Sequence, residues 1–535
     1  MDFQDSLISE GIFIHPEAKK LIKEKNSPDK FLKEVINFIP DSEAVILPKH
    51  IKKYLNSKSK NQKNPNSQSR SNPNPDSRSL SEESKKSTED NNKVRDKEES
   101  KVKSVKNSSK KKKKDDLGDH KDEKQGSEFR VIKDITGKSE SEGELDDFLS
   151  YFRDRFSKIK DKLKVRNELR DFRPIESLKR VKSEEISFIG IVREVRETKN
   201  NHKLLIIEDE TEEVPAIALK NKQEVFEDSE KVLKDEIIGI KGRLTDDSDL
   251  VIINKIIWPD KQIRSEQNTA DRKFYTAFVS DIHFGSKCFL EKPWNKFIKW
   301  LNGDLGGENL KKLSKEVEYL VIAGDIVEGI GIYPNQKQEL SLKSIKEQYK
   351  EAAKQLSRIP DRVKIVLSPG NHDAVRQAEP QPALENKVAE FFNELENVEL
   401  VGNPSQIEID GVKILVYHGR SLDDLVASIP GLSYDEPGKI MEEFVRRRHL
   451  APRYGGNTPL SPEKEDYMVV DDPDIIHSGH IHKFGINNYR DVTLLNTGTW
   501  QGQTKFMRKR GIEPVTGKVT LMKMDELTPK VLNFS

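Results

Sequence analysis

The side chains with the clearest chemical potential are carboxylates, an amide and imidazoles, gathered in five short motifs. In chain order the motifs are Asp281-Ile282-His283, Gly324-Asp325-Ile326-Val327-Glu328, Gly370-Asn371-His372-Asp373, His418-Gly419 and Gly479-His480-Ile481-His482. Each motif closes an apolar run typical of a buried strand, and α/β folds place functional groups at the carboxyl ends of such strands. Carboxylate oxygens and neutral imidazole nitrogens are ligands of Mn, Fe and Zn. The pattern therefore predicts that the five motifs meet at one metal centre.

Two of the motifs carry a pair of candidate ligands at the same spacing. Asp281 and His283 are two residues apart, as are His480 and His482, and side chains at this spacing point to one side of an extended strand end. One such pair alone is a weak signal of metal binding. Five of the 11 histidines, however, fall in the five motifs, and this joint pattern favours a two-metal site over unrelated surface or core histidines.

The chemistry that these residues suggest is hydrolysis of a phosphodiester. Two metal ions about 3.5–4 Å apart lower the pKa of a bridging water and neutralise charge on the phosphoryl oxygens. Asp325 can bridge two ions with its two carboxylate oxygens, and Asn371 offers a neutral amide oxygen. His372 directly follows Asn371, so we expect it to contact the phosphate and to protonate the leaving oxygen. Glu328 or Asp373 is expected to orient His372.

The composition limits the class of protein. The 535 residues are 34% hydrophobic and 35% charged, and with a net charge of +1 any polyanion must be bound by a local basic patch. The single cysteine excludes an internal disulfide and a cysteine-based zinc site. The sequence has no apolar run long enough to span a membrane and no signal-peptide pattern. We therefore expect a cytoplasmic protein with no membrane partner.

The motifs lie in residues 272–535, where apolar strands alternate with helical segments. Strands are predicted at 274–279, 319–323, 363–367 and 412–417. Residues 183–262 hold five further strand-like segments, at 186–195, 203–208, 214–219, 236–243 and 250–258. Such a series of short strands predicts a small barrel, for example an OB-fold. The barrel has few aromatic residues, so a role in holding a partner stays open beside the binding of single-stranded nucleic acid.

Three segments precede the barrel. Residues 1–55 predict a small helical module, because Ser27 and Pro28 are typical of a helix start. Residues 56–127 have almost no large apolar side chains, which predicts a disordered polar linker. Residues 128–182 predict a helical connecting segment with an apolar stripe. The stripe consists of Phe148, Leu149, Phe152, Phe156, Ile159 and Leu163.

The five motifs resemble those of the calcineurin-like metallophosphoesterase superfamily. Longer stretches are similar to the small subunit of archaeal family D DNA polymerase. These stretches are residues 133–138, 324–334, 370–382, 418–421 and 496–501. The resemblance covers residues 128–535, and it implies that residues 272–535 form an α/β domain, a layered β-sandwich flanked by helices.

The resemblance also implies a role for each site residue. One metal ion would be held by Asp281, His283, Asp325 and His482, and the other by Asp325, Asn371, His418 and His480. His372 would be the catalytic histidine, supported by Glu328, Asp373 and Arg376. The implied activity is that of a 3′-to-5′ exonuclease that proofreads for a separate large catalytic subunit, acting on DNA with a 3′ end. Its cofactors would be two divalent ions, with Mn favoured and Fe or Zn as alternatives.

Two other functions fit part of the pattern. A scaffold subunit with a vestigial site is disfavoured because the set of candidate ligands is complete. A small-molecule phosphatase or a free repair nuclease is disfavoured by the preceding barrel and by the segments Tyr333-Pro334 and Gln381-Pro382. A barrel joined to a catalytic domain suits a subunit that must hold a partner. The sequence therefore favours a proofreading subunit of a replicative DNA polymerase.

Overall fold

The computed structural model describes residues 128–180, 185–245, 250–263 and 267–535, and a few short pieces of the first 55 residues. These pieces are 13–14, 22, 28–36, 38, 45–46, 51 and 54–55. The predicted disordered linker, 56–127, lies outside the described residues. The chain divides into two compact units, Met1–Leu117 and Gly118–Ser535.

The N-terminal unit contains the predicted helix. Helix α3 (Pro28–Ile36) begins at the expected proline, which lacks the N–H that a first helical position leaves unpaired. One face of the helix buries Leu32 and Val35, and the Tyr54 hydroxyl donates a hydrogen bond of 2.6 Å to Glu34 Oε2. Two short strands, β1 (Phe13–Ile14) and β2 (Val45–Ile46), pair in parallel, so the module is not wholly helical.

The second unit contains two six-stranded sheets, and the predicted α/β class is confirmed. In the first sheet the order is β12-β11-β10-β9-β18-β19. Its strands are β9 (Tyr275–Val279), β10 (Val317–Ala323), β11 (Lys364–Ser368), β12 (Val398–Leu400), β18 (Lys518–Lys523) and β19 (Thr528–Asn533). Strands β9 to β12 run parallel, so β9, β10 and β11 end side by side at one edge.

The second sheet has the order β16-β17-β15-β14-β13-β3. Its strands are β3 (Phe129–Lys133), β13 (Ser405–Ile409), β14 (Val412–Val416), β15 (Ile475–Ser478), β16 (Phe484–Tyr489) and β17 (Val492–Thr497). Strands β14, β15 and β17 are parallel. Strand β3 pairs with β13, so the segment expected to be a helical connection begins with an edge strand of this sheet.

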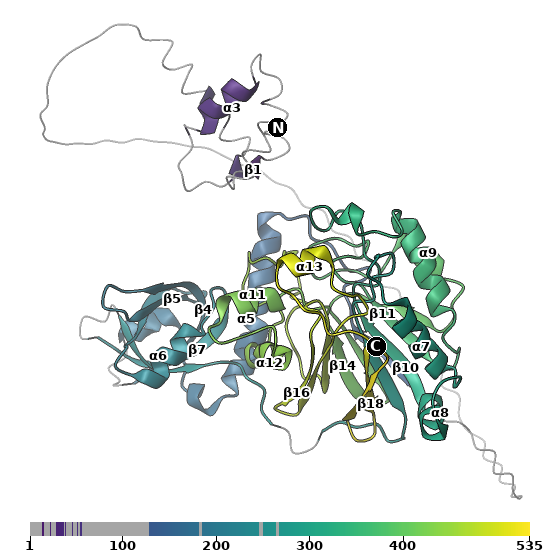
Figure 1. Cartoon of the computed structure of the whole chain (residues 1–535). Coiled ribbons are helices and arrows are strands. Elements are labelled where there is room, and N and C mark those ends of the chain that lie inside the picture. Colours follow the sequence, from purple (N-terminus) through teal and green to yellow (C-terminus); the bar gives the residue numbers. More distant parts are fainter. Residues whose placement is uncertain are drawn as a thin grey trace, which may run out of the picture. The chain divides into compact units, whose positions relative to one another are not determined.

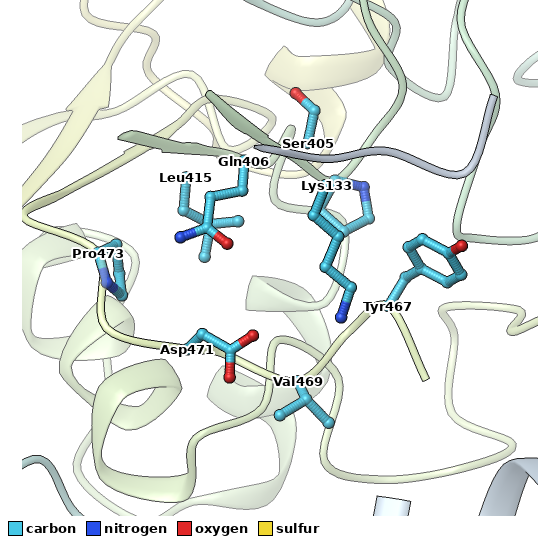
Figure 2. A pocket seen from close by; sticks show the side chains of 9 residues that line it. Lys133, Ser405, Gln406, Leu415, Tyr467, Val469, Asp471 and Pro473 are labelled. Carbon is cyan, nitrogen blue, oxygen red and sulfur yellow. The ribbon is translucent and has the colours of Figure 1, made fainter. Parts of the chain in front are cut away.

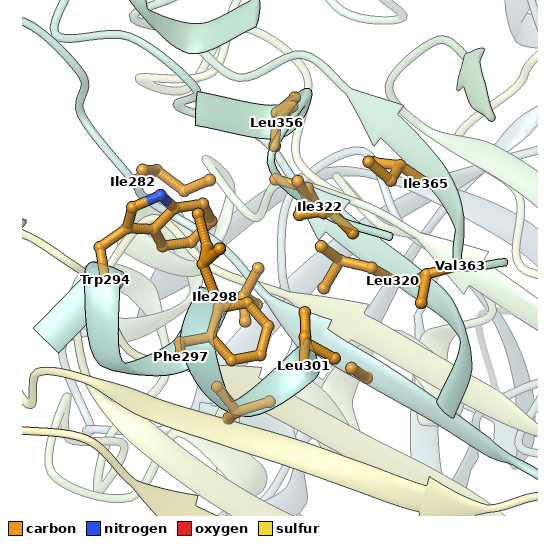
Figure 3. Close-up of a cluster of buried hydrophobic side chains, with 14 of the residues drawn as sticks. Ile282, Trp294, Phe297, Ile298, Leu301, Leu320, Ile322, Leu356, Val363 and Ile365 are labelled. Atoms are coloured by element: carbon orange, nitrogen blue, oxygen red, sulfur yellow. The ribbon is translucent and has the colours of Figure 1, made fainter. Parts of the chain in front are cut away.

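Helices cover the outer faces of both sheets (Figure 1). On the first sheet lie α7 (Glu291–Leu301), α8 (Glu308–Lys315) and α9 (Ile345–Leu356). Figure 3 shows Trp294 and Phe297 of α7 against Leu320 and Ile322 of β10, and all four side chains are fully buried. On the second sheet lie α11 (Leu422–Ser428) and α12 (Pro437–Arg447). Burial of each such side chain stabilises the fold by about 1.5–3 kcal/mol relative to leaving it exposed.

The two sheets pack on each other through their inner faces. Strand β10 shows how the sequence achieves this, because successive side chains of a strand point to opposite faces. Leu320 and Ile322 face the helices, whereas Tyr319 and Val321 join the cluster between the sheets. The second sheet contributes Ile407, Ile414 and Ile475, among others, to the same cluster. A strand buried on both faces is apolar throughout, which explains the apolar runs before the motifs.

The five strands predicted for residues 183–262 are all present and close into a barrel in the order β4-β5-β6-β8-β7. The strands are β4 (Ile186–Glu197), β5 (Lys203–Glu208), β6 (Glu213–Ala218), β7 (Ile237–Leu244) and β8 (Val251–Ile257), with helix α6 (Gln223–Glu230) between β6 and β7. Arg447 of α12 fastens the barrel to the sheets. Its Nε lies 2.8 Å from Glu236 Oε2, and its Nη2 donates to the Lys231 carbonyl at 2.6 Å.

Helix α5 (Leu145–Lys164) is the predicted amphipathic helix. Phe156, Ile159 and Leu163 are buried as expected, but Leu149 is 45% exposed, so the prediction was wrong for this position. Arg155 takes a buried place instead and is held by Asp466. The remaining short helices are η1 (Asn167–Leu169), η2 (Ile175–Arg180), η3 (Gln336–Gln338), α10 (Asn386–Ala389), η4 (Glu390–Phe392) and α13 (Lys505–Lys509).

None of the helices in the described part of the chain is long and apolar enough to cross a lipid bilayer.

A pocket beside β13 is lined by Lys133, Gln406, Tyr467 and Asp471, among others (Figure 2). None of its lining residues belongs to the five motifs, so we assign it no part in the chemistry.

Candidate metal centre

The five motifs come together where the two sheets meet at the carboxyl ends of their strands. Three motifs follow the adjacent strands β9, β10 and β11, and two follow the adjacent strands β14 and β15. The carboxylates of Asp281 and Asp325 are buried at this junction, with relative exposures of 0% and 2%. The packing of one sheet on the other is therefore what brings together residues that lie up to 201 positions apart in sequence, Asp281 and His482.

The backbone at the ligand positions is left-handed, which corrects the expected extended geometry. The φ angles are 51° at Asp281, 57° at His283, 49° at Asp325, 70° at His480 and 54° at His482. Non-glycine residues in this region are strained by about 1–3 kcal/mol each, and such strain persists only where the surroundings impose it. Here the Asp281 amide donates to the Gly324 carbonyl at 3.0 Å, and the His283 amide donates to the Asp325 carbonyl at 3.0 Å. The paired ligands thus converge through turns and not through a strand.

The side chains of Asp281, His283 and His482, which follow strands of both sheets, lie close together. The His482 Nε2 atom lies 3.3 Å from Asp281 Oδ1, and the His283 Nε2 atom lies 4.0 Å from the same oxygen. The two histidine nitrogens are 3.1 Å apart. The amide of His480 donates to both carboxylate oxygens of Asp281 at 3.0 Å, which holds the carboxylate in place. This group has the size and donor types of a metal site.

Asp325 stands between the two halves of the cluster. Its Oδ2 atom lies 3.7 Å from His283 Nε2 and 3.8 Å from His372 Nε2, while its Oδ1 atom lies 3.3 Å from His418 Nε2. The two oxygens therefore face different groups of nitrogen atoms. Beyond His418, the Asn371 Oδ1 atom is 3.0 Å from His418 Nε2 and 2.9 Å from His480 Nδ1. The structure thus places all seven predicted ligands in one continuous cluster.

The second ring nitrogens fix how several histidines are oriented. His418 Nδ1 lies 3.0 Å from the Ala323 carbonyl, and His372 Nδ1 lies 2.7 Å from the Glu328 carbonyl. A carbonyl oxygen can only accept, so each Nδ1 carries a proton and each ring turns its Nε2 atom toward the cluster. His480 is reversed: its Nε2 lies 3.2 Å from Asp423 Oδ2, and its Nδ1 faces Asn371. Outer partners of this kind orient metal-binding imidazoles.

Glu328 and Asp373 do not orient His372 through their carboxylates, contrary to the expectation. The Glu328 Oε2 atom lies 3.1 Å from His283 Nδ1, and its Oε1 accepts a 2.6 Å bond from the Tyr333 hydroxyl. Only the backbone carbonyl of Glu328 contacts His372. The Asp373 carboxylate instead accepts backbone N–H groups, including that of Gly370 at 2.8 Å, and so fixes the turn of its own motif. Such backbone N–H donors leave no signal in the types of residues along the sequence.

Arg376 supports the site from further away. Its guanidinium lies 3.0 Å from Glu463 Oε1 and donates to Ser139 Oγ at 2.6 Å. It also donates to the Pro380 carbonyl from Nε at 2.8 Å. Arg376 therefore fixes the loop that carries Asn371 against the segments around residues 139 and 463.

Two residues of the site were not singled out from the sequence. Asp423, on helix α11, is the carboxylate that faces His480. Gln501 donates from Nε2 to Glu328 Oε2 and to Ser286 Oγ at 2.7 Å. Asp423 lies five residues after His418, in the first turn of a helix that follows the fourth motif. An acidic residue so placed is the sequence signal that would have identified it.

The electrostatics of the cluster are set by burial and by charge pairing. Burial alone would raise the pKa of Asp325, but the neighbouring imidazoles of His372 and His418 hold it well below its usual range. Burial would likewise lower the pKa of His418, yet the Asp325 carboxylate beside it raises that pKa to about 10. In the described residues no lysine or arginine forms an ion pair with Asp281 or Asp325. Positive charge at this site must therefore come from histidine protons or from cations.

The donor set fits divalent metal ions. Three overlapping groups of Asp and His residues have ligand atoms within 4.8 Å of one another. The Nε2 atoms of His283 and His482 face each other at 3.1 Å, and two facing lone pairs repel unless a proton or a cation lies between them. His482 Nδ1 is buried without a hydrogen-bond partner among the described residues. Buried carboxylates with imidazole nitrogens suit Mn, Fe and Zn.

Known proteins with similar sequences place the chain in a family. A family model that describes the B subunits of DNA polymerases alpha and epsilon matches residues 276–485. The DNA polymerase II small subunit of Archaeoglobus fulgidus is 47% identical over 74% of this chain and 78% of its own length. The corresponding protein of Methanothermobacter thermautotrophicus is 43% identical over 76% of this chain and 83% of its own. The chain therefore belongs to the family of archaeal DNA polymerase II small subunits, the small subunits of family D DNA polymerase.

A third relative and one solved structure complete the comparison. The DNA polymerase II small subunit of Methanocaldococcus jannaschii is 42% identical over 74% of this chain and 67% of its own length. A solved archaeal phosphodiesterase is 14% identical over 48% of this chain and 99% of its own, with a TM-score of 0.26. That structural likeness supports no assignment, whereas the relatives confirm the resemblance of the sequence motifs to the family D small subunit.

Proposed function

We propose that this small subunit is a metal-dependent phosphodiesterase that removes nucleotides from DNA 3′ ends. The observation that carries the proposal is the convergence of seven candidate ligands from five strand ends around the two oxygens of Asp325. Two packed sheets with outer helices support the assignment of residues 272–535 to the calcineurin-like metallophosphoesterase fold.

Following the family resemblance, we assign the cluster to two ligand groups that share Asp325. The first group is Asp281, His283, Asp325 and His482, and the second is Asp325, Asn371, His418 and His480. When bound, two divalent ions would activate a water as nucleophile and neutralise charge on the phosphoryl oxygens. The buried carboxylates and the fixed imidazoles hold this geometry before any substrate arrives. Mn is the favoured ion, and Fe and Zn suit the same donors.

His372 is proposed as the general acid. Its side chain is 14% exposed, whereas that of His283 is 1% exposed, so a substrate phosphate can reach it. Because the Glu328 carbonyl fixes Nδ1, the Nε2 atom faces Asp325 and the cluster. Burial lowers the pKa of His372, but the Asp325 and Glu328 carboxylates raise it above its ordinary value. A raised pKa favours the protonated ring, which is the form that an acid for the leaving oxygen requires.

The polymerase context supports a proposal for the substrate and the partner. The relatives are named as small subunits of a DNA polymerase, so we infer that this chain assembles with a large catalytic subunit and proofreads its product. The barrel order β4-β5-β6-β8-β7, with parallel β6 and β8 and a helix between β6 and β7, supports an OB-fold. Its aromatic residues Phe188 and Trp258 are buried and Phe226 is half-buried, which favours a role in holding protein over base stacking.

The proposal is tested with a primer that carries a mismatched 3′ end, in the presence of Mn²⁺. We expect the primer to shorten and the shortening to vanish in His372→Ala, while metal content stays at the wild-type level. His202→Ala, on the barrel, is the matched control and should shorten the primer normally. Cleavage of nitrophenyl phosphate with DNA left intact would indicate a small-molecule phosphatase. Inert protein with both metals bound would indicate a scaffold role.

A further inference from the structure

An aromatic pair lies beside the candidate metal centre and takes no part in the ligand set. The rings of Tyr333 and Phe506 are stacked, with centroids 4.8 Å apart and planes inclined by 27°. The Tyr333 ring centroid lies 6.2 Å from that of His372. Both aromatic side chains are half-buried, so each stacked ring retains surface that solvent can reach. The two rings come from the loop after β10 and from helix α13.

A cluster of cations surrounds this pair. Lys505, Arg508, Lys509 and Arg510 are all exposed, and the Arg510 guanidinium lies over the Phe506 ring, 4.6 Å from its centroid. In the described part of the chain, Lys505 alone among the four has a carboxylate within 4.0 Å, that of Glu339 at 3.8 Å. Helix α13 therefore presents positive charge that its own fold leaves largely uncompensated, next to a site built for phosphodiesters.

Helix α13 is held in place by contacts other than those of Phe506. The Thr504 hydroxyl caps α13 by accepting a bond from the Met507 amide at 3.1 Å, and Met507 is buried. The Tyr333 hydroxyl contributes to the structure, because it donates a hydrogen bond to the Glu328 carboxylate. Phe506 has no polar group in its side chain that could do the same. Half-exposed aromatic rings with interleaved cations are how proteins bind single-stranded nucleic acid, since every base has a face that stacks and every phosphate a charge.

We propose that Tyr333, Phe506 and the cations of residues 505–510 form a platform for the unpaired DNA strand that leads to the metal centre. The platform rests on the proposed phosphodiesterase function and narrows its substrate. A base stacks on the exposed aromatic surface while lysine and arginine side chains contact the adjacent phosphates. A paired 3′ end must then fray before it is cut, which is the property that lets a nuclease favour mismatched ends.

The test is binding of a fluorescent oligodeoxythymidine to the full chain, measured by anisotropy in EDTA so that no cleavage occurs. Phe506→Ala removes one base stack and should bind the oligodeoxythymidine about tenfold more weakly, whereas Phe506→Trp should keep the wild-type affinity. Lys509→Ala should reduce the slope of log affinity against log salt by about 0.7, the value for one phosphate contact on a single strand. Lys312→Ala, on the distant helix α8, removes the same charge and should change nothing.

The outcomes separate the platform from the catalytic proposal. Binding that falls in Phe506→Ala supports the platform even if the protein cuts nothing when Mn²⁺ is restored. Unchanged affinity in Phe506→Ala, in a protein that shortens primers normally, would overturn the platform and leave the nuclease standing. Binding of a blunt duplex with the same affinity as the oligodeoxythymidine would also overturn the platform. So would binding of an acidic peptide with that affinity, if the same substitutions weakened it. Thermal unfolding of each variant checks that the fold is intact.

Discussion

The Nε2 atoms of His283 and His482 lie 3.1 Å apart, although one residue follows the first sheet and the other follows the second. The other ring nitrogen of His283 faces the Glu328 carboxylate at 3.1 Å. Burial lowers the pKa of His283 more than Glu328 raises it, so this ring is neutral and its Nε2 lone pair points at the site. A cation between the sheets would satisfy both histidines, so we expect bound metal to stabilise the sheet junction.

Divalent ions are therefore expected to stabilise the folded chain. At a free metal concentration of about 100 times Kd, binding at one site adds about 2.7 kcal/mol to the free energy of unfolding. Addition of Mn²⁺ to metal-free protein should raise the thermal midpoint, and EDTA should reverse the change. A midpoint that is the same with and without Mn²⁺, measured by calorimetry, would contradict a metal-dependent junction.

Asp325→Ala is expected to be the most damaging single substitution. It removes an oxygen from each proposed ligand group, whereas any other ligand substitution affects one group. Loss of an outer partner alone typically costs about 10–100-fold in metal affinity, so loss of a shared ligand should cost more than about 100-fold. Metal content by mass spectrometry should fall towards zero. If the variant keeps both ions, Asp325 does not bridge the two ligand groups. Asp410→Ala, on the turn between β13 and β14, serves as a control and should leave the metal content unchanged.

Asp423→Asn tests the outer support of the second ligand group. The Asp423 carboxylate faces His480 Nε2 at 3.2 Å and accepts a 3.0 Å bond from the Tyr434 hydroxyl. Without the negative charge, His480 is a less firmly oriented ligand, and metal affinity should fall by about 10–100-fold. Tyr434→Phe should have a smaller effect in the same direction. Calorimetric titration with Mn²⁺ measures both, and equal affinity in wild type and Asp423→Asn would refute the positioning role.

The sequence was informative where local signals exist. Apolar runs predicted β9, β10, β11 and β14, because strands buried on both faces must be apolar. The pairing of β3 with β13 left no such signal, since Arg130 and Glu408 meet across 278 positions. Left-handed φ angles at Asp281 and His480 were also hidden, because non-glycine residues adopt them only when tertiary contacts impose the strain. The candidate ligands could thus be chosen from the residues, but their geometry required the fold.

Glu379 should make stability depend on pH. Burial raises its pKa to about 7, against an ordinary value of 4.5, although the Tyr417 hydroxyl donates to it at 2.9 Å. The stabilisation from the neutral carboxyl group is fully present below pH 4.5 and is lost as the pH rises through 7. The loss amounts to about 3 kcal/mol. Glu379→Gln should flatten this slope in urea unfolding experiments between these pH values, and a slope identical to wild type would refute the assignment.

Arg155 is expected to be the residue of α5 on which stability depends most. Its Nε lies 2.8 Å from Asp466 Oδ2, both side chains are at most 1% exposed, and His449 Nε2 lies 2.8 Å from the same oxygen. Arg155→Met leaves the Asp466 charge buried without its main partner, which typically costs about 3–5 kcal/mol. The paired change Arg155→Met with Asp466→Asn removes that charge and should recover part of the loss.

Lys158→Met is the matched control for Arg155 on the same helix. Lys158 lies 2.9 Å from Glu465 Oε1, but the two side chains are 28% and 47% exposed. Water screens such a pair, and surface ion pairs typically contribute less than about 1 kcal/mol. Urea unfolding of the full chain should therefore separate the two substitutions clearly. If Arg155→Met were no more destabilising than Lys158→Met, the buried ion pair between Arg155 and Asp466 would not be the contact that stabilises the packing of α5 on the segment around Asp466.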